Sequence, residues 1–208
     1  MLFLLVILYI VTLVYIPITE RYRHYASLVG LQGWILLGVA LLRLHTIDLW
    51  ELGFVIAETL IFKAIIVPAM LFSIIRRTGI NRVINRSGSF KTLLLSLIFL
   101  AASGWITYLI HDTRIDMVFF AVALYALLSG LLLIVSRKRI FSHLVGFLVI
   151  ENGVLLFSMA IGVEMPFLIN IAILLDIIIS VLMLGLFMSK IGDRMHDLDS
   201  DTLTTIKD

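Results

Sequence analysis

The sequence contains no cysteine. This absence excludes disulfides, thiolate metal sites and cysteine-ligated iron–sulfur clusters from the chain. Charged residues are also scarce, at 14% of 208 positions, whereas an average soluble domain has about 25%. The sequence has no Walker loop, nucleophile elbow, zinc motif or dinucleotide fingerprint. A self-contained enzyme site is therefore not visible.

Histidines are few, and all five fall at or near the ends of apolar runs: His24, His45, His111, His143 and His196. A pair facing each other deep in a membrane, as a b-type haem requires, is not expected from these positions. We therefore expect no cofactor in this chain. The net charge of +2 is small and gives no reason to invoke nucleic acid.

Apolar residues make up 62% of the sequence, and they recur in runs of about 20, each long enough to cross a membrane as a helix. Barrel strands would instead show alternating segments of about ten residues. The first run has no basic residue ahead of it and no cleavage pattern before Glu20, so we interpret it as a retained span. The pattern predicts an all-α, polytopic integral membrane protein with seven spans, at 2–17, 26–43, 50–75, 91–110, 116–136, 141–163 and 166–190.

Basic residues alternate between rich and poor connections. The first, third and fifth connections and the C-terminal tail hold thirteen of them: Arg21, Arg23, Arg76, Arg77, Arg82, Arg86, Lys91, Arg137, Lys138, Arg139, Lys190, Arg194 and Lys207. The other connections hold only Arg43 and Arg114. The positive-inside rule predicts a multi-pass protein of the cell (inner) membrane, with the N-terminus outside and the C-terminus in the cytoplasm.

Two short stretches indicate an internal repeat. Residues 24–30, near the start of the second span, resemble residues 141–146, near the start of the sixth, and each stretch follows a basic loop. Spans one to three would then correspond to spans five to seven, as in parallel-repeat transporters. The expected units are a three-helix unit (1–90), a linking helix (91–115), a second three-helix unit (116–190) and a cytoplasmic tail (191–208).

Four charged residues lie deep within the predicted spans, away from the span ends: Glu58, Lys63, Glu151 and Asp176. Each charge at a helix centre costs about 2.5–3.5 kcal/mol on insertion scales, so such residues usually mark an ion pathway or a buried partner. Groups held out of water in this way can exchange protons near neutral pH. The residues therefore predict a proton pathway. The alternative is that Lys63 and the carboxylates neutralise one another in static pairs.

In an α-helix, Glu58 and Lys63 would stand about 140° apart, which favours partners on other helices or other subunits. Asn152 and Ser180 are accessory candidates that could hold water or orient the carboxylates, or simply form interhelical hydrogen bonds. His143 is a candidate for proton entry, or else an ordinary interfacial histidine. Pro68 is expected to kink the third span.

With these residues placed, the chain resembles component E of the hydrogenase-4 and formate hydrogenlyase group. The similarity lies in residues 136–153, in the lysine-to-proline stretch within residues 58–68, and at Asp176. The last three spans are also similar to the NuoK-type subunit of respiratory complex I, which carries buried glutamates in its second and third spans. Asp176 falls where the third-span glutamate would be, whereas Glu151 lies about one turn beyond the expected position.

The resemblance implies a non-catalytic membrane-arm subunit of a complex I-related assembly, foremost a membrane-bound [NiFe] hydrogenase. It would sit beside antiporter-like subunits and a hydrogenase or quinone-reducing peripheral arm, with [NiFe] and iron–sulfur centres in those partners. Its charges would carry protons (or Na⁺). Two alternatives remain open: a purely structural connector of such a complex, and an autonomous cation/proton antiporter.

Overall fold

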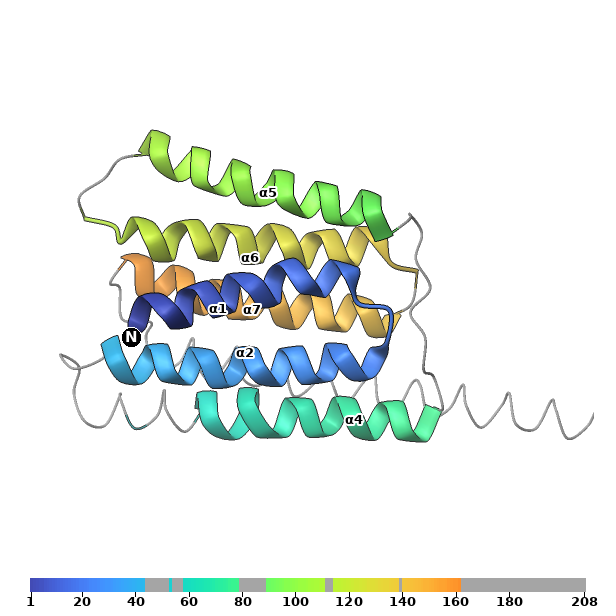
Figure 1. Cartoon of the computed structure of the whole chain (residues 1–208). Helices are drawn as coiled ribbons and strands as arrows, with labels where there is room; N and C mark the ends of the chain where they lie inside the picture. Colours follow the sequence, from blue (N-terminus) through green and yellow to red (C-terminus); the bar gives the residue numbers. More distant parts are fainter. Residues whose placement is uncertain (44–52, 54–57, 79–88, 111–113, 139, 162–208) are drawn as a thin grey trace, which may run out of the picture.

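The structure, a computed structural model, describes residues 1–43, 53, 58–78, 89–110, 114–138 and 140–161. These residues form a bundle of helices that lie side by side with their axes roughly aligned (Figure 1). In chain order the elements are α1 (Leu2–Tyr15), η1 (Ile16–Ile18), α2 (Tyr22–Arg43), η2 (Glu58–Ile66), α4 (Val67–Thr78), α5 (Ser89–Ile110), α6 (Met117–Ser136) and α7 (Ile140–Ile161).

The helices are long and apolar enough to cross a membrane, as the composition predicts. Five stretches meet that description, at Tyr22–Leu42, Thr59–Arg76, Phe90–Ile110, Met117–Ser136 and Ile140–Ile161, and Leu2–Ile18 forms a shorter apolar helix. The described parts of the first six predicted spans are thus helical, whereas most of residues 50–57 in the third span and all of the seventh span, 166–190, lie outside the described residues. The prediction of an all-α, polytopic membrane protein is confirmed.

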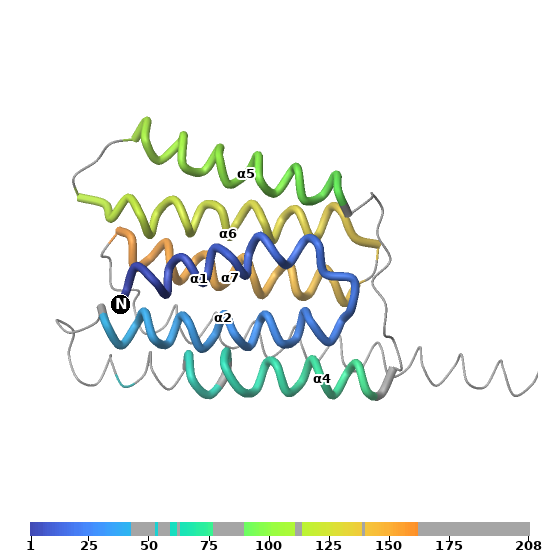
Figure 2. Tube along the Cα trace, in the orientation of Figure 1, coloured from blue at the N-terminus to red at the C-terminus, as the bar shows by residue number. Residues whose placement is uncertain are grey.

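Helix α2 occupies a central place, because it contacts α1, η2, α4 and α7. The tube view shows α4 along one edge of the bundle and α5 along the other (Figure 2). Helix α5 rests mainly on α6 and leaves most of its apolar side chains exposed. The buried core consequently lies between α1, α2, α4, α6 and α7.

Glycines bring α6 and α7 into backbone contact. A Cβ atom added at Gly130 would stand 2.5 Å from the Gly146 carbonyl oxygen, and one at Gly146 would stand 2.7 Å from the Gly130 carbonyl oxygen. Two turns further along α7, Gly153 faces the Ala126 side chain. Small residues of this kind let membrane helices approach closely and gain dispersion energy. Helices α6 and α7 form the closest-packed pair among the described elements.

Polar contacts fix the two ends of the α6–α7 pair. Asp116 caps α6, because its Oδ1 accepts hydrogen bonds from the backbone amides of Val118 and Phe119 at 3.1 and 3.3 Å. At the other end, Arg137 donates from Nη2 to the Pro17 carbonyl oxygen at 2.5 Å. This bond ties the α6–α7 connection to the α1–α2 connection. Arg137, which the charge pattern places among the solvated loop cations, is only 2% exposed.

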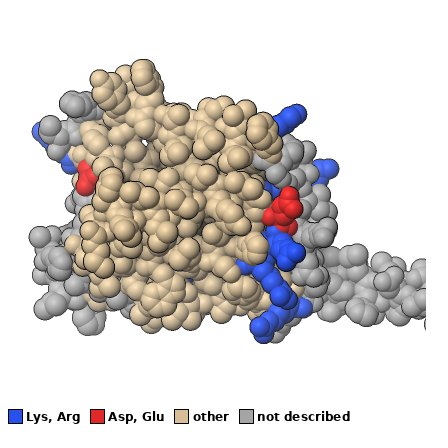
Figure 3. Space-filling model, in the orientation of Figure 1, with Lys and Arg blue, Asp and Glu red and all other residues tan. Residues whose placement is uncertain are grey.

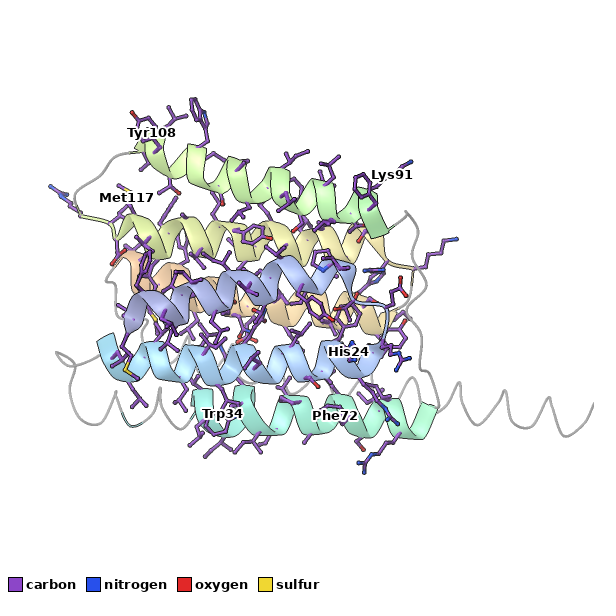
Figure 4. The ribbon with its side chains drawn as sticks, in the orientation of Figure 1. His24, Trp34, Phe72, Lys91, Tyr108 and Met117 are labelled. Atoms are coloured by element: carbon purple, nitrogen blue, oxygen red, sulfur yellow. The ribbon has the colours of Figure 1, made fainter. Side chains whose placement is uncertain are left out.

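Exposed basic side chains gather at one end of the bundle (Figure 3). In chain order, Arg21 and Arg23 lie at the start of α2, Arg76 in the last turn of α4, Lys91 in the first turn of α5 and Lys138 between α6 and α7, whereas Arg114 lies in the α5–α6 connection. Figure 4 labels His24 and Lys91 at the basic end and Tyr108 and Met117 at the opposite end. The described cations therefore follow the alternation seen in the sequence, while the direction in which the bundle crosses the membrane remains a prediction.

The predicted repeat pairs α1 and α2 with α6 and α7. Both pairs are helical hairpins, but α6 and α7 pack far more closely on each other than α1 and α2 do. The partner of the third span would be 166–190, which lies outside the described residues. The repeat and the unit boundaries drawn from it therefore stay predictions.

Candidate ion-pair site at mid-helix

A buried ion pair joins the third and sixth predicted spans. The Nζ atom of Lys63, on η2, lies 2.7 Å from Oε1 of Glu151, on α7. Both side chains are almost fully enclosed, at 6% and 8% exposure. Glu151 is the twelfth of the 22 residues of α7, so it stands about 16 Å from either end of that helix. The pair lies midway along the helix, far from both polar ends.

The backbone that carries Lys63 is irregular. Residues Glu58–Ile66 form a π-helix, and Pro68 follows as the second residue of α4. Proline has no backbone N–H, so the carbonyls one turn before it lose a donor, and π-helical segments often occur at functional sites. Pro68 was expected to kink the span, and here it directly follows the change from π- to α-helix.

The π-helix corrects one expectation drawn from the sequence. The separation of about 140° between Glu58 and Lys63 assumes an α-helix, whereas a π-helix bonds residue i to residue i+5 and reduces the angle between residues five apart. The expectation that Lys63 has its partner on another helix is nevertheless confirmed by Glu151. The Glu58 side chain lies outside the described part of the structure.

A chain of hydrogen bonds crosses the bundle beside the ion pair. Asn152, next to Glu151, donates from Nδ2 to Oε1 of Gln32 on α2 at 3.3 Å. Gln32 donates from Nε2 to Oγ1 of Thr12 on α1 at 3.1 Å, and Thr12 in turn donates to the Tyr9 carbonyl oxygen at 2.6 Å. All of these polar groups are buried. The interior therefore contains a polar layer that joins α1, α2 and α7 and ends at Asn152, the residue next to Glu151 in the sequence.

Sequence reasoning identified Lys63, Glu151 and Asn152 but missed the other members of this layer. Gln32 and Thr12 are uncharged, and an isolated amide or hydroxyl in a span gives a weak signal. The one available signal was the position of Gln32 between Gly30 and Gly33, since glycines in a membrane helix often mark close contacts. Tyr9 was also missed. It is 2% exposed, and its backbone carbonyl oxygen accepts the hydrogen bond from Thr12.

The remaining predicted site residues are not brought together with this layer. His143 stands near the basic end of α7, where its Nε2 atom lies 3.0 Å from the Arg137 carbonyl oxygen. Asp176 and Ser180 lie outside the described residues. Within the described ranges, no three histidine or acidic side chains converge in a way that could hold a metal ion.

The cost of removing its two charges from water distinguishes this pair from a surface salt bridge. Removing a carboxylate and an ammonium from water costs several kcal/mol each, and only a close contact with its further hydrogen bonds offsets that cost. Replacing a buried pair by apolar residues is often neutral or stabilising. The pair therefore contributes little to stability by itself, but its two groups lie within direct proton-transfer distance and both side chains are almost fully enclosed.

The chain is similar to known proteins over almost its whole length. It is 24% identical to "Hydrogenase-4 component E" of Escherichia coli (strain K12), over 96% of this chain and 94% of that protein. The proteins of the same name from Escherichia coli O157:H7 and Shigella flexneri give the same identity and coverage.

The chain resembles hydrogenase-4 component E from end to end. The predicted resemblance to hydrogenase-4 component E is thus confirmed, whereas the similarity of the last three spans to the NuoK-type subunit stays a prediction. No protein-family model matches the chain, and no solved structure matches it.

Proposed function

We propose that this chain is a membrane-arm subunit of a complex I-related, membrane-bound [NiFe] hydrogenase. In this proposal the Lys63–Glu151 pair is one step of a proton path coupled to redox chemistry in other subunits. The observation that carries it is the enclosed 2.7 Å contact between these groups midway along α7. The full-length similarity to "Hydrogenase-4 component E" supports the type of complex.

The two groups suit transient proton storage. While Glu151 is ionised, Lys63 neutralises it. A proton that arrives at the carboxylate removes that attraction and frees the ammonium to move or to give up its own proton. Such a cycle needs the two charges to interact strongly, which the exclusion of water provides. Asp176 and Glu58 remain candidates for neighbouring steps, with His143 as a candidate for entry at the basic end.

In this proposal the hydrogen chemistry and its metal centres reside in partner chains. The partners are antiporter-like membrane subunits and a hydrogenase or quinone-reducing peripheral arm. The chain lies in the cell (inner) membrane with its basic end toward the cytoplasm. Affinity purification through this subunit, followed by identification of the co-purifying chains, tests this part. A [NiFe] large subunit is expected, and purification of an active transporter without partners would overturn it in favour of an autonomous antiporter.

The proton role is tested in the assembled complex in sealed vesicles, by proton movement per electron transferred. Glu151→Gln is expected to reduce that ratio at least tenfold while electron transfer continues, and Glu151→Asp should restore part of it by keeping a carboxyl group. Ser96→Ala is the matched control, because it removes a buried hydrogen bond to Tyr125 on the far side of the bundle. Repeating the series with and without Na⁺ distinguishes H⁺ from Na⁺ as the moving ion.

A second function is favoured by one observation, namely that the pair is already in direct contact. A permanent contact would make this chain a structural connector that seals neighbouring subunits together. In that case Glu151→Gln leaves proton movement per electron unchanged and instead reduces the amount of assembled complex. An unchanged ratio in both Glu151→Gln and Lys63→Met would contradict the proton role.

A further inference from the structure

Two consecutive residues of α2 contact the backbone of Lys63 and the residue next to Glu151. Gln32 bonds to Asn152, the neighbour of Glu151, and Gly33 packs against the backbone of Lys63. We propose that Gln32 and Gly33 are positioning residues that set the distance between Lys63 and Glu151. The inference rests on the proposed function, because it gives this spacing a role in proton transfer.

Gly33 permits the approach of the lysine segment. A Cβ atom at this position would stand 2.7 Å from the Lys63 carbonyl oxygen, 2.8 Å from its carbonyl carbon and 2.9 Å from the Ala64 nitrogen. All three are backbone atoms, which cannot turn aside as the end of a flexible side chain can. Any larger residue at position 33 must therefore push the π-helix and Lys63 away from α2.

Gln32 holds the other partner. It is fully buried and bonds on one side to Thr12 and on the other to Asn152. Because Asn152 directly follows Glu151, this bond fixes both the height and the rotation of α7 at the carboxylate. Loss of the Gln32 amide would leave the buried Asn152 amide without this acceptor, which is unfavourable for a polar group held out of water.

Helix geometry explains why neighbouring residues serve both partners. Consecutive residues of an α-helix stand about 100° apart, so Gln32 faces α1 and α7 while Gly33 faces η2. Helix α2 thus sets the distance between η2, which carries Lys63, and α7, which carries Glu151. Small displacements matter for such a pair, since misplacement by about 1 Å can reduce a transfer rate about a hundredfold.

The test is an infrared pH titration of the Glu151 carboxyl group in the assembled complex, with the spectrum of Glu151→Gln subtracted. Lys63→Met gives the midpoint for a carboxyl group that has no ion-pair partner. Gly33→Ala and Gln32→Leu are expected to move the midpoint toward that of Lys63→Met by about one pH unit or more. Such a shift corresponds to about 1.4 kcal/mol per unit. Proton movement per electron, measured in the same samples, should fall about tenfold.

Gly38→Ala is the matched control on the same helix, because its added Cβ meets only Leu5 Cδ1, the end of a flexible side chain, at 3.1 Å. Its midpoint should stay within a few tenths of a unit of the parent. Lower protein yield in Gly33→Ala and Gln32→Leu with an unmoved midpoint would overturn the positioning role. Moved midpoints with normal proton movement, also in Glu151→Gln, would support the positioning role and contradict the proposed function instead.

Discussion

Glycines allow close backbone contact at two places in this bundle, between α6 and α7 and between α2 and η2, and the two contacts differ in the kind of helix involved. At the α6–α7 contact, Gly130 and Gly146 place two regular helices backbone against backbone. At the α2–η2 contact, Gly33 admits a π-helical segment instead. The first contact supports the helix that carries Glu151, and the second supports the segment that carries Lys63.

The comparison shows that Glu151 and Lys63 are carried by backbone segments that differ in regularity and packing. Glu151 belongs to a regular helix packed along most of its length against α6. Lys63 belongs to a segment whose hydrogen-bond pattern changes to that of an α-helix just before Pro68. Movement that opens and closes the pair is therefore expected on the lysine side, with Glu151 as the fixed point.

The largest effect is expected from breaking the pair on the lysine side. Lys63→Met leaves the Glu151 carboxylate buried without its partner, and loss of one member of a buried pair costs about 3–5 kcal/mol. The variant should show a marked drop in the thermal unfolding temperature of the purified protein in detergent.

The double variant Lys63→Met with Glu151→Leu serves as its control. Replacement of both charges by apolar groups is often neutral or stabilising, so most of the lost stability should return. A double variant as unstable as Lys63→Met would show that the cost arises from lost packing rather than from an unpaired charge.

A smaller effect is expected at the α6–α7 contact. Gly130→Ala forces a Cβ atom within 2.5 Å of a backbone oxygen, and overpacking of this kind costs about 1–3 kcal/mol. The midpoint of thermal unfolding should fall, whereas Gly104→Ala should leave it unchanged because nothing lies within 4 Å of that position. Equal midpoints for the two variants would mean that α6 and α7 do not depend on close backbone contact.

The smallest effect is expected at the far end of the polar layer. Thr12→Val keeps the shape of the side chain and removes the acceptor for Gln32 Nε2. Interhelical hydrogen bonds in membranes contribute about 0.6 kcal/mol on average, so the unfolding midpoint should fall only slightly. A loss as large as that of Lys63→Met would show that the hydrogen-bond chain, rather than the ion pair, dominates this region.

The spans that the structure describes were predictable because each requires only a long apolar run. Predicted limits such as 91–110 and 116–136 differ by two residues at most from Ser89–Ile110 and Met117–Ser136. Lys63 and Glu151 were also identifiable, since a charge inside an apolar run is costly and therefore conspicuous.

The pairing itself was not predictable from local sequence. It depends on the π-helix, which turns Lys63 away from the direction an α-helix would give it. It also depends on how closely α2, η2 and α7 approach one another. The contact of Gly33 with the Lys63 backbone, which no local pattern reveals, determines part of this approach. Similarly, nothing near Arg137 indicated that this loop cation would be buried against the Pro17 carbonyl, 120 residues away in the chain.

The most direct test of the account is the protonation state of Glu151 while the complex turns over. Time-resolved infrared spectra of the assembled complex, compared with Glu151→Gln, isolate the signal of this one carboxyl group. The account predicts that a protonated-carboxyl band appears and decays once in each catalytic cycle and is absent in Glu151→Gln. A carboxylate that stays ionised and paired with Lys63 throughout turnover would contradict it.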